Sequence, residues 1–109
     1  MNTSIHNFDQ QEIEKRIFTI RDVQVMFDSH LAEMYGVETK VLNQSVKRNA
    51  ERFPESFCFQ LTEVEFSNLR SQFVTSSTEH GGRRYLPYVF TEQGVAMLSA
   101  ILRSEFATG

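Results

Sequence analysis

The sequence has few residues that could cross-link the chain or bind a metal ion. Its 109 residues include one cysteine, Cys58, and three histidines, His6, His30 and His80. One cysteine cannot form an intramolecular disulfide, and a structural zinc site needs several cysteine or histidine ligands. The histidines are far apart in the sequence. We therefore expect no disulfide, no metal site and no cofactor.

Long apolar runs and an excess of positive charge are also missing. No segment approaches the length of a membrane-spanning helix, and the N-terminus lacks the apolar core of a secretory signal. We therefore expect a cytoplasmic protein without a membrane partner. The formal net charge is −3, which argues against a non-specific nucleic-acid coat protein. It does not exclude a local basic patch, because the electrostatic field depends on how charges are distributed.

Tryptophan is absent too, and ten phenylalanines supply much of the apolar content, which is 40% of the residues. A chain of this length is one domain, and this composition can build one modest core. Residues 1–16 are mostly polar, and we interpret them as an N-terminal arm ahead of a domain over residues 17–107. The chain stops just beyond an apolar helix, so we expect it to be the N-terminal part of a longer protein.

The stretch from Asp28 to Phe53 predicts two helices joined by a tight turn. Apolar residues recur at helical spacing in both halves: Leu31, Ala32 and Tyr35 in the first, and Val37, Leu42 and Val46 in the second. Asp28 or Ser29 can cap the first helix. Gly36 ends it, because glycine adopts the left-handed conformation at little steric cost.

The second predicted helix, over residues 39–49, has a face of basic and amide side chains. Spacings of three, four and seven residues place Lys40, Asn43, Gln44 and Lys47 on one side. Asparagine and glutamine can pair bidentately with adenine in the major groove, and lysine can reach guanine or a phosphate. This is the plan of a DNA-reading helix-turn-helix. The alternative is an ordinary helical hairpin with a solvated polar face, and the pattern alone leaves both open.

Positive charge continues past this face. From Thr39 to Arg52 the sequence has four basic residues and one acid, Glu51. We interpret Arg48 and Arg52 as phosphate anchors rather than base readers. Either arginine can instead pair with Glu51 or Glu55 on the surface, which would add little stability.

Short strands and two further helices complete an α+β prediction. Residues 17–27 are rich in β-branched and aromatic residues and predict a β-hairpin with its turn at Arg21-Asp22. Residues 57–61 alternate as a half-buried strand would. Residues 86–90 predict another strand, and Pro87 suggests that it lies at a sheet edge.

Thr62 and Glu65 have the spacing of a capping box and open the first of the two further helices. Its predicted buried side consists of Val64, Phe66, Leu69 and Phe73. The last helix begins near residues 91–93, and its predicted core face consists of Val95, Met97, Leu98, Ile101 and Leu102.

A second basic segment follows the small, polar stretch 75–82. Gly81-Gly82-Arg83-Arg84-Tyr85 combines backbone freedom, two cations for phosphates or a narrow minor groove, and a stacking ring. We interpret it as a wing beside the second helix. The alternative is a hairpin tip with incidental charge.

Enzyme chemistry is not indicated. Cys58 stands between two phenylalanines in a predicted strand, a setting more typical of a small packing residue than of a nucleophile. No carboxylate pair has a supporting motif, and no phosphate-binding glycine pattern occurs.

Long segments of the chain resemble the phage-type ORF-six N-terminal domain family, which is related to the KilA-N and Bro-N domains of phages and large DNA viruses. The resemblance covers about residues 17–107 and rests on VMFDSHLAEMYGVETKVLNQSVKRNAERFPESFCFQLTEVEF, LRSQFVTSS and GGRRYLPYVFTEQGVAML, in that order. It implies a DNA-binding module at the N-terminus of a phage antirepressor or prophage transcription regulator.

The leading hypothesis is therefore insertion of the helix 39–49 into the major groove of double-stranded DNA. The predicted contacts are Thr39, Lys40, Asn43, Gln44, Lys47, Arg48, Arg52, Arg83, Arg84 and Tyr85. One short helix contacts few bases, so we expect a homodimer on half-sites about 34 Å apart. The alternative is an antirepressor module that binds another phage or host regulator, which the acidic net charge favours. A nuclease or other enzyme is not expected.

Overall fold

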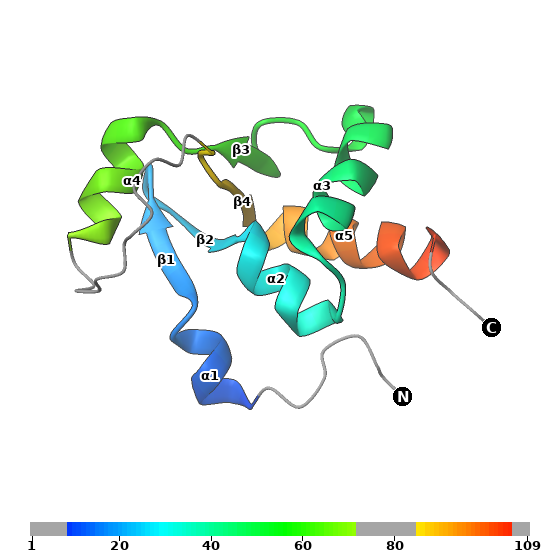
Figure 1. Cartoon of the computed structure of the whole chain (residues 1–109), viewed down its shortest axis with the longest axis horizontal. Helices are drawn as coiled ribbons and strands as arrows, with labels where there is room; N and C mark the ends of the chain where they lie inside the picture. The colour runs from blue at the N-terminus through cyan, green and yellow to red at the C-terminus, as the bar shows by residue number, and fades with distance from the viewer. Residues whose placement is uncertain (1–8, 72–84, 106–109) are drawn as a thin grey trace.

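A computed structural model describes residues 9–71 and 85–105 of the chain (Figure 1). In these two ranges, α-helices and one 3-10 helix surround a four-stranded antiparallel sheet, which confirms the predicted α+β class. The elements are α1 (Gln10–Glu14), β1 (Ile17–Ile20), β2 (Val23–Phe27), α2 (Asp28–Tyr35), α3 (Thr39–Arg48), η1 (Ala50–Arg52), β3 (Cys58–Gln60), α4 (Glu63–Arg70), β4 (Tyr88–Thr91) and α5 (Glu92–Glu105).

The first two strands form the predicted hairpin. Ile20 pairs with Val23, so the connecting turn has only two residues. These are Arg21, with φ 56°, and Asp22, with φ 65°. Two positive φ values in a two-residue loop define a type I′ turn, whose twist matches that of the flanking strands.

The sheet order is β1-β2-β4-β3, with every neighbouring pair antiparallel. The strand predicted at residues 86–90 therefore lies in the middle of the sheet, and its predicted edge position was wrong. Pro87 comes just before β4 and supplies only its carbonyl, which accepts the backbone N–H of Leu61 at 3.0 Å. A proline outside the ladder does not have to donate a hydrogen bond, so it places no limit on where the strand lies.

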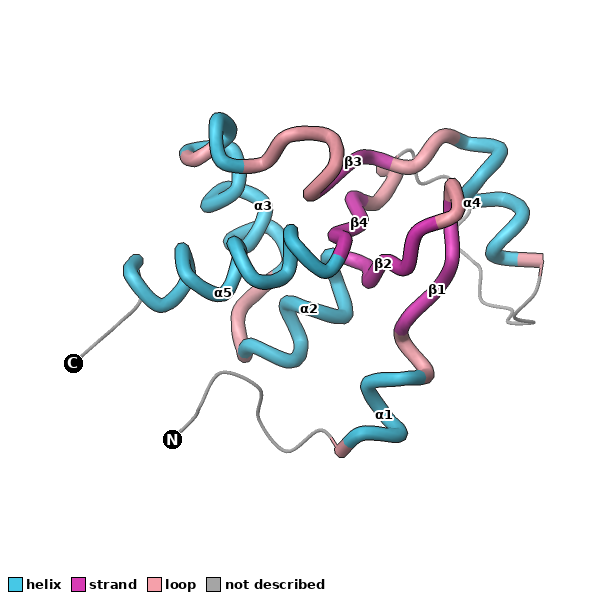
Figure 2. Tube along the Cα trace, turned by 180° about the vertical axis from the view of Figure 1, so that it is seen from behind, coloured by secondary structure: helices cyan, strands magenta, loops and turns pink. Residues whose placement is uncertain are grey.

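Helices cover both faces of the sheet, as Figure 2 shows from behind. On one face Met26, Cys58 and Phe90 pack in a cluster with the buried hydrophobic residues of α2, α3 and α5. On the other face the sheet contributes Val25, Phe59 and Val89, which cluster with Leu69 of α4. The strand β3 is thus buried at both Cys58 and Phe59 rather than half-buried as predicted.

The capping box of α4 is present as predicted. The backbone N–H of Glu65 donates to Thr62 Oγ1 at 3.1 Å, and Glu65 Oε1 accepts from the Thr62 N–H at 2.9 Å. Leu69 is buried, but Val64 is 68% exposed, contrary to prediction. Val64 precedes Phe66 by two positions, and residues two apart do not share a helix face. Phe73, predicted on the same buried side, lies outside the described residues.

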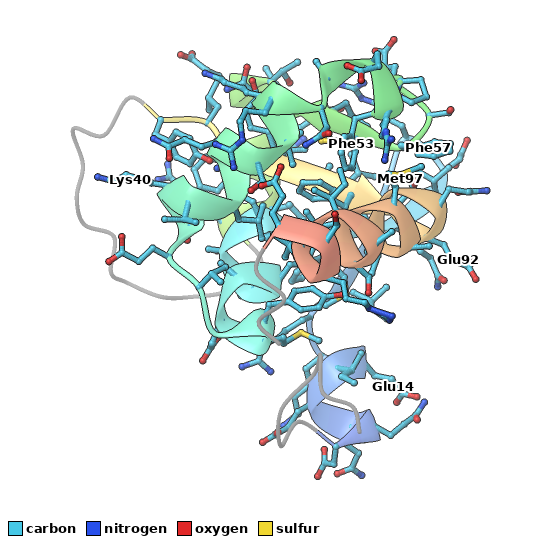
Figure 3. All side chains as sticks on the ribbon, turned by 90° about the vertical axis from the view of Figure 1, so that its right-hand side faces the viewer. Glu14, Lys40, Phe53, Phe57, Glu92 and Met97 are labelled. Carbon is cyan, nitrogen blue, oxygen red and sulfur yellow. The ribbon has the colours of Figure 1, made fainter. Side chains whose placement is uncertain are left out.

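The helix α5 buries Leu98, Ile101 and Leu102, as its predicted core face requires. Its first turn packs on the backbone that leads into β3. Phe57 O accepts the N–H of Thr91 at 3.0 Å, and a Cβ added to Gly94 would lie 1.9 Å from the same oxygen. Phe57 and Met97, both labelled in Figure 3, are partly buried against the same core cluster. No described helix is both long enough and apolar enough to cross a membrane.

Candidate nucleic-acid interface

The predicted turn between α2 and α3 is confirmed. Gly36 follows α2 with φ 74° and ψ 31°, the left-handed conformation that glycine adopts without a steric penalty. Its N–H donates to Glu33 O at 3.2 Å, and the N–H of Val37 donates to Ala32 O at 3.0 Å. These bonds close the end of α2, and α3 begins three residues later at Thr39.

One side of α3 is fixed in the core and the other is open. Leu42 and Ser45 have 0% exposure, whereas Lys40, Gln44 and Lys47 are exposed. Lys40 points away from the body of the protein in Figure 3. Within the described parts of the chain, these three exposed side chains form no hydrogen bond or ion pair. They are therefore available to a ligand as the structure stands.

Asn43 belongs to the same stretch of α3 but is already engaged. It is half-buried, and its Nδ2 donates to Asp28 Oδ2 at 2.9 Å and to the Tyr85 hydroxyl at 3.0 Å. These two acceptors also contact each other, so the amide nitrogen, the carboxylate and the phenol meet at one point.

Asp28 is the centre of this network and is only 1% exposed. Its Oδ2 accepts from Asn43, from the Tyr85 hydroxyl and from the Tyr88 N–H, and its Oδ1 accepts from the Ser29 N–H. The predicted capping role of Asp28 or Ser29 was wrong. The N-cap is Phe27, which has no side-chain cap bond, and Asp28 is the first helical residue, where a carboxylate interacts favourably with the helix dipole.

The C-terminal part of α3 is held by Glu105 of α5. Glu105 Oε1 accepts from Ser45 Oγ at 2.8 Å and from Arg48 Nη2, and Oε2 accepts from Asn49 Nδ2 at 3.2 Å. These bonds, chiefly the one from Arg48, lower the pKa of Glu105 to about 2. Arg48 therefore pairs with Glu105 rather than with Glu51 or Glu55, the partners considered from the sequence.

The remaining predicted contacts lie in different settings. Thr39 is half-buried at the start of α3, and Arg52 is exposed in η1. Arg52 has no ion pair with any described residue. Tyr85 is 43% exposed and touches Asn43 of α3 through its hydroxyl. Arg83 and Arg84, with Gly81 and Gly82, lie outside the described residues.

Asp28 and Glu105 are the two site residues that sequence reasoning missed. Asp28 was considered only as a cap, because nothing in the local pattern indicates that a carboxylate after a strand is buried. Glu105 lies 57 residues from Arg48, and helical periodicity carries no information about a partner that far away. Spacing within one element cannot reveal either role.

Other chemistry has little support in the described ranges. The thiol of Cys58 is buried, and burial, with a smaller effect of the nearby Asp28, raises its pKa to about 12. Such a thiol stays protonated at neutral pH and is a poor nucleophile. Residues 9–71 and 85–105 hold no group of three histidine, cysteine, aspartate or glutamate side chains that could bind a metal ion.

The family of the chain follows from a match to the ORF6N domain over residues 15–101. This match runs from just before β1 into α5 and includes the whole sheet and the α2–α3 pair. The chain therefore belongs to the ORF6N family, a phage-type family of regulatory domains. No curated protein and no solved structure matches it.

Proposed function

We propose that this domain is the DNA-binding module of a phage- or prophage-type transcriptional regulator or antirepressor, acting without enzymatic activity in the cytoplasm. The observation that carries the proposal is the exposed face of α3, where Lys40, Gln44 and Lys47 have no partner in the described chain. A basic and amide face on the second helix of a helix-turn-helix pair is suited to the major groove. Membership of the ORF6N family supports a regulatory setting.

The spacing of the residues on this face indicates a different role for each. Lys40 and Lys47 are seven positions apart, about 10 Å along the helix axis, with Gln44 between them. Since the major groove is about 12 Å wide, the two lysines can reach its phosphate borders while Gln44 faces a base edge. We assign phosphate contact to the lysines and base contact to Gln44, which can pair bidentately with adenine.

Flanking contacts complete the proposed interface. Arg52 is exposed just beyond α3 and would bind the DNA backbone, as would Thr39 at the helix start. The wing of Arg83, Arg84 and Tyr85 remains a prediction, as does a homodimer. The dimer proposal rests on the few bases that one helix can read. It does not rest on an apolar dimer surface, because the exposed large apolar side chains of the described chain lie on separate elements.

The test is a binding titration on a duplex that the protein itself selects from a random library. We expect Lys40→Ala and Lys47→Ala each to flatten the plot of log affinity against log salt by about 0.9 units, the value for one phosphate contact. Gln44→Ala should lower affinity for the selected duplex more than for a scrambled one. Lys15→Ala is the matched control, because Lys15 is exposed next to α1, away from α3 (Figure 1).

Two outcomes would contradict the proposal. One is no binding of the wild-type domain to duplex DNA at low salt. The other is an effect of Lys15→Ala as large as that of Lys47→Ala, which would indicate attraction to overall charge rather than use of α3. Either outcome would favour the alternative, an antirepressor module that binds another regulator. The net charge of −3 and the neutralisation of Arg48 by Glu105 support that alternative.

A further inference from the structure

Within residues 9–71 and 85–105, the buried carboxylate of Asp28 has no cationic partner. Among the described residues its partners are an amide, a phenol and two backbone N–H groups, and no ion pair involves it. Removing a carboxylate from water is costly, and only a full set of well-placed donors offsets that cost. The positions of these donors are therefore strongly constrained.

The side chains of this network come from three separate parts of the chain. Asp28 begins α2, Asn43 lies in the middle of α3, and Tyr85 precedes β4. Asn43 Nδ2 lies 2.9 Å from Asp28 Oδ2 and 3.0 Å from the Tyr85 hydroxyl, which itself donates to Asp28. Three mutual contacts form a closed triangle, so a movement of α3 would disturb more than one bond.

We propose that Asn43 and Tyr85 are positioning residues that act through Asp28 and hold α3 at the rotation that turns Lys40, Gln44 and Lys47 outward. This inference rests on the proposed DNA-binding function. Asn43 adjoins Gln44 and lies one helical turn from Lys40 and Lys47, so fixing it fixes the direction of its neighbours. Asn43 then contributes to DNA binding without touching a base.

The existing bonds of Asn43 support positioning over base contact. Bidentate pairing with adenine requires an amide that donates and accepts at the same time. Asn43 Nδ2 is already bonded to Asp28 and Tyr85, so turning this amide toward a base would remove a donor from a buried carboxylate. Gln44 has no such commitment within the described chain and remains free for a base.

Tyr85 provides the cleaner test, because its two ends have different surroundings. Its hydroxyl is bonded inward, whereas the residue as a whole is 43% exposed. Burial and the neighbouring Asp28 raise the pKa of Tyr85, which keeps the phenol protonated as a donor at neutral pH. Tyr85→Phe removes the bond to Asp28 and keeps the ring.

The experiment compares Asn43→Ala, Tyr85→Phe and their double variant with Gln44→Ala. Affinity is measured on the selected and the scrambled duplex, with circular dichroism to confirm that each variant is folded. If the two residues position α3, each single variant should weaken binding to both duplexes by about tenfold. The double variant should bind as tightly as the single variant with the lower affinity, since both changes disrupt the same network. Gln44→Ala should instead lose affinity mainly for the selected duplex.

Three results would overturn the inference while leaving the proposed function intact. They are a loss confined to the selected duplex for Asn43→Ala, unchanged binding by folded Tyr85→Phe, and additive losses in the double variant. Failure of the proposed function looks different, because Lys47→Ala would then leave the salt dependence unchanged.

Discussion

The carboxylate of Glu105, in the last turn of α5, pairs with the guanidinium of Arg48, in the last turn of α3. Ser45 and Asn49 donate to the same carboxylate, so one acidic side chain holds the C-terminal part of the proposed DNA-reading helix. The sequence predicts Arg48 as a phosphate anchor, but in the structure Glu105 offsets its charge. The affinity of α3 for DNA should therefore depend on the end of α5.

We expect Glu105→Gln to strengthen DNA binding and to steepen the plot of log affinity against log salt by about 0.9 units. The reason is that a released Arg48 can neutralise one phosphate. Fluorescence anisotropy at a series of salt concentrations measures both quantities. Glu63→Gln is the control, because it removes the same charge from an exposed position on α4, behind the sheet. Equal gains in the two variants would assign the effect to net charge.

A second ion pair should make stability depend on pH. Glu65 accepts from Arg21 at 2.8 and 3.1 Å. The hydrogen bond from Arg21 is the largest cause that lowers the pKa of Glu65 from an ordinary 4.5 to about 2. Since the folded-state pKa lies below the unfolded-state value, the pair stabilises the fold above pH 4.5. This contribution is lost as the pH falls toward about 2.

Thermal denaturation followed by circular dichroism across this pH range tests the pair. Glu65→Gln should reduce the loss of stability on acidification, since glutamine can keep the capping-box bond to Thr62 while it removes the titrating group. Glu105 has a similarly low pKa, so part of the acid sensitivity should remain in Glu65→Gln and disappear only in the double variant. An unchanged pH profile in Glu65→Gln would show that the Arg21 pair contributes nothing.

Features fixed by neighbours in the sequence could be predicted. The hairpin turn at Arg21-Asp22, the left-handed Gly36 and the capping box of Thr62 each depend on a few consecutive residues. Their geometry follows from backbone sterics and short-range hydrogen bonds. The buried face of α5 follows equally from helical spacing.

Features fixed by long-range packing could not be predicted. The central place of β4 depends on its pairing with both β2 and β3. The local pattern of residues 86–90 does not indicate how many strands pair with it. The burial of both Cys58 and Phe59 requires helices on both faces of the sheet. In the candidate site, helical spacing predicted the exposed face of α3. The same spacing also assigned Asn43 to that face. It could not show that Asn43 is bonded inward, because the Asp28 network joins residues up to 60 positions apart.

Gly94 should be intolerant of any side chain. A Cβ there would lie 1.9 Å from Phe57 O, a backbone atom that also accepts the Thr91 N–H. We expect Gly94→Ala to destabilise the domain by about 3 kcal/mol, the upper end of the usual cost of overpacking. Chemical denaturation gives the value. Ala100 is exposed on the same helix, and there alanine should be the more stable residue, so that Ala100→Gly costs about 1 kcal/mol. A neutral Gly94→Ala would mean that α5 does not approach residue 57 this closely.

The hairpin turn can be stabilised at one of its two positions only. Arg21 and Asp22 both have positive φ, a conformation that costs L-residues energy and that glycine adopts freely. Asp22 is exposed and its side chain forms no hydrogen bond or ion pair in the described chain, so Asp22→Gly should stabilise the domain by about 0.5–1 kcal/mol.

Arg21→Gly should not give the same gain, although it relieves the same backbone strain. Arg21 pairs with Glu65, and its guanidinium lies 4.0 Å from the centre of the Phe59 ring. Both contacts tie the hairpin to β3 and α4, and glycine would lose them. Urea denaturation of the two variants measures the difference. A larger gain from Arg21→Gly than from Asp22→Gly would mean that the contacts of Arg21 contribute less than the strain of its backbone.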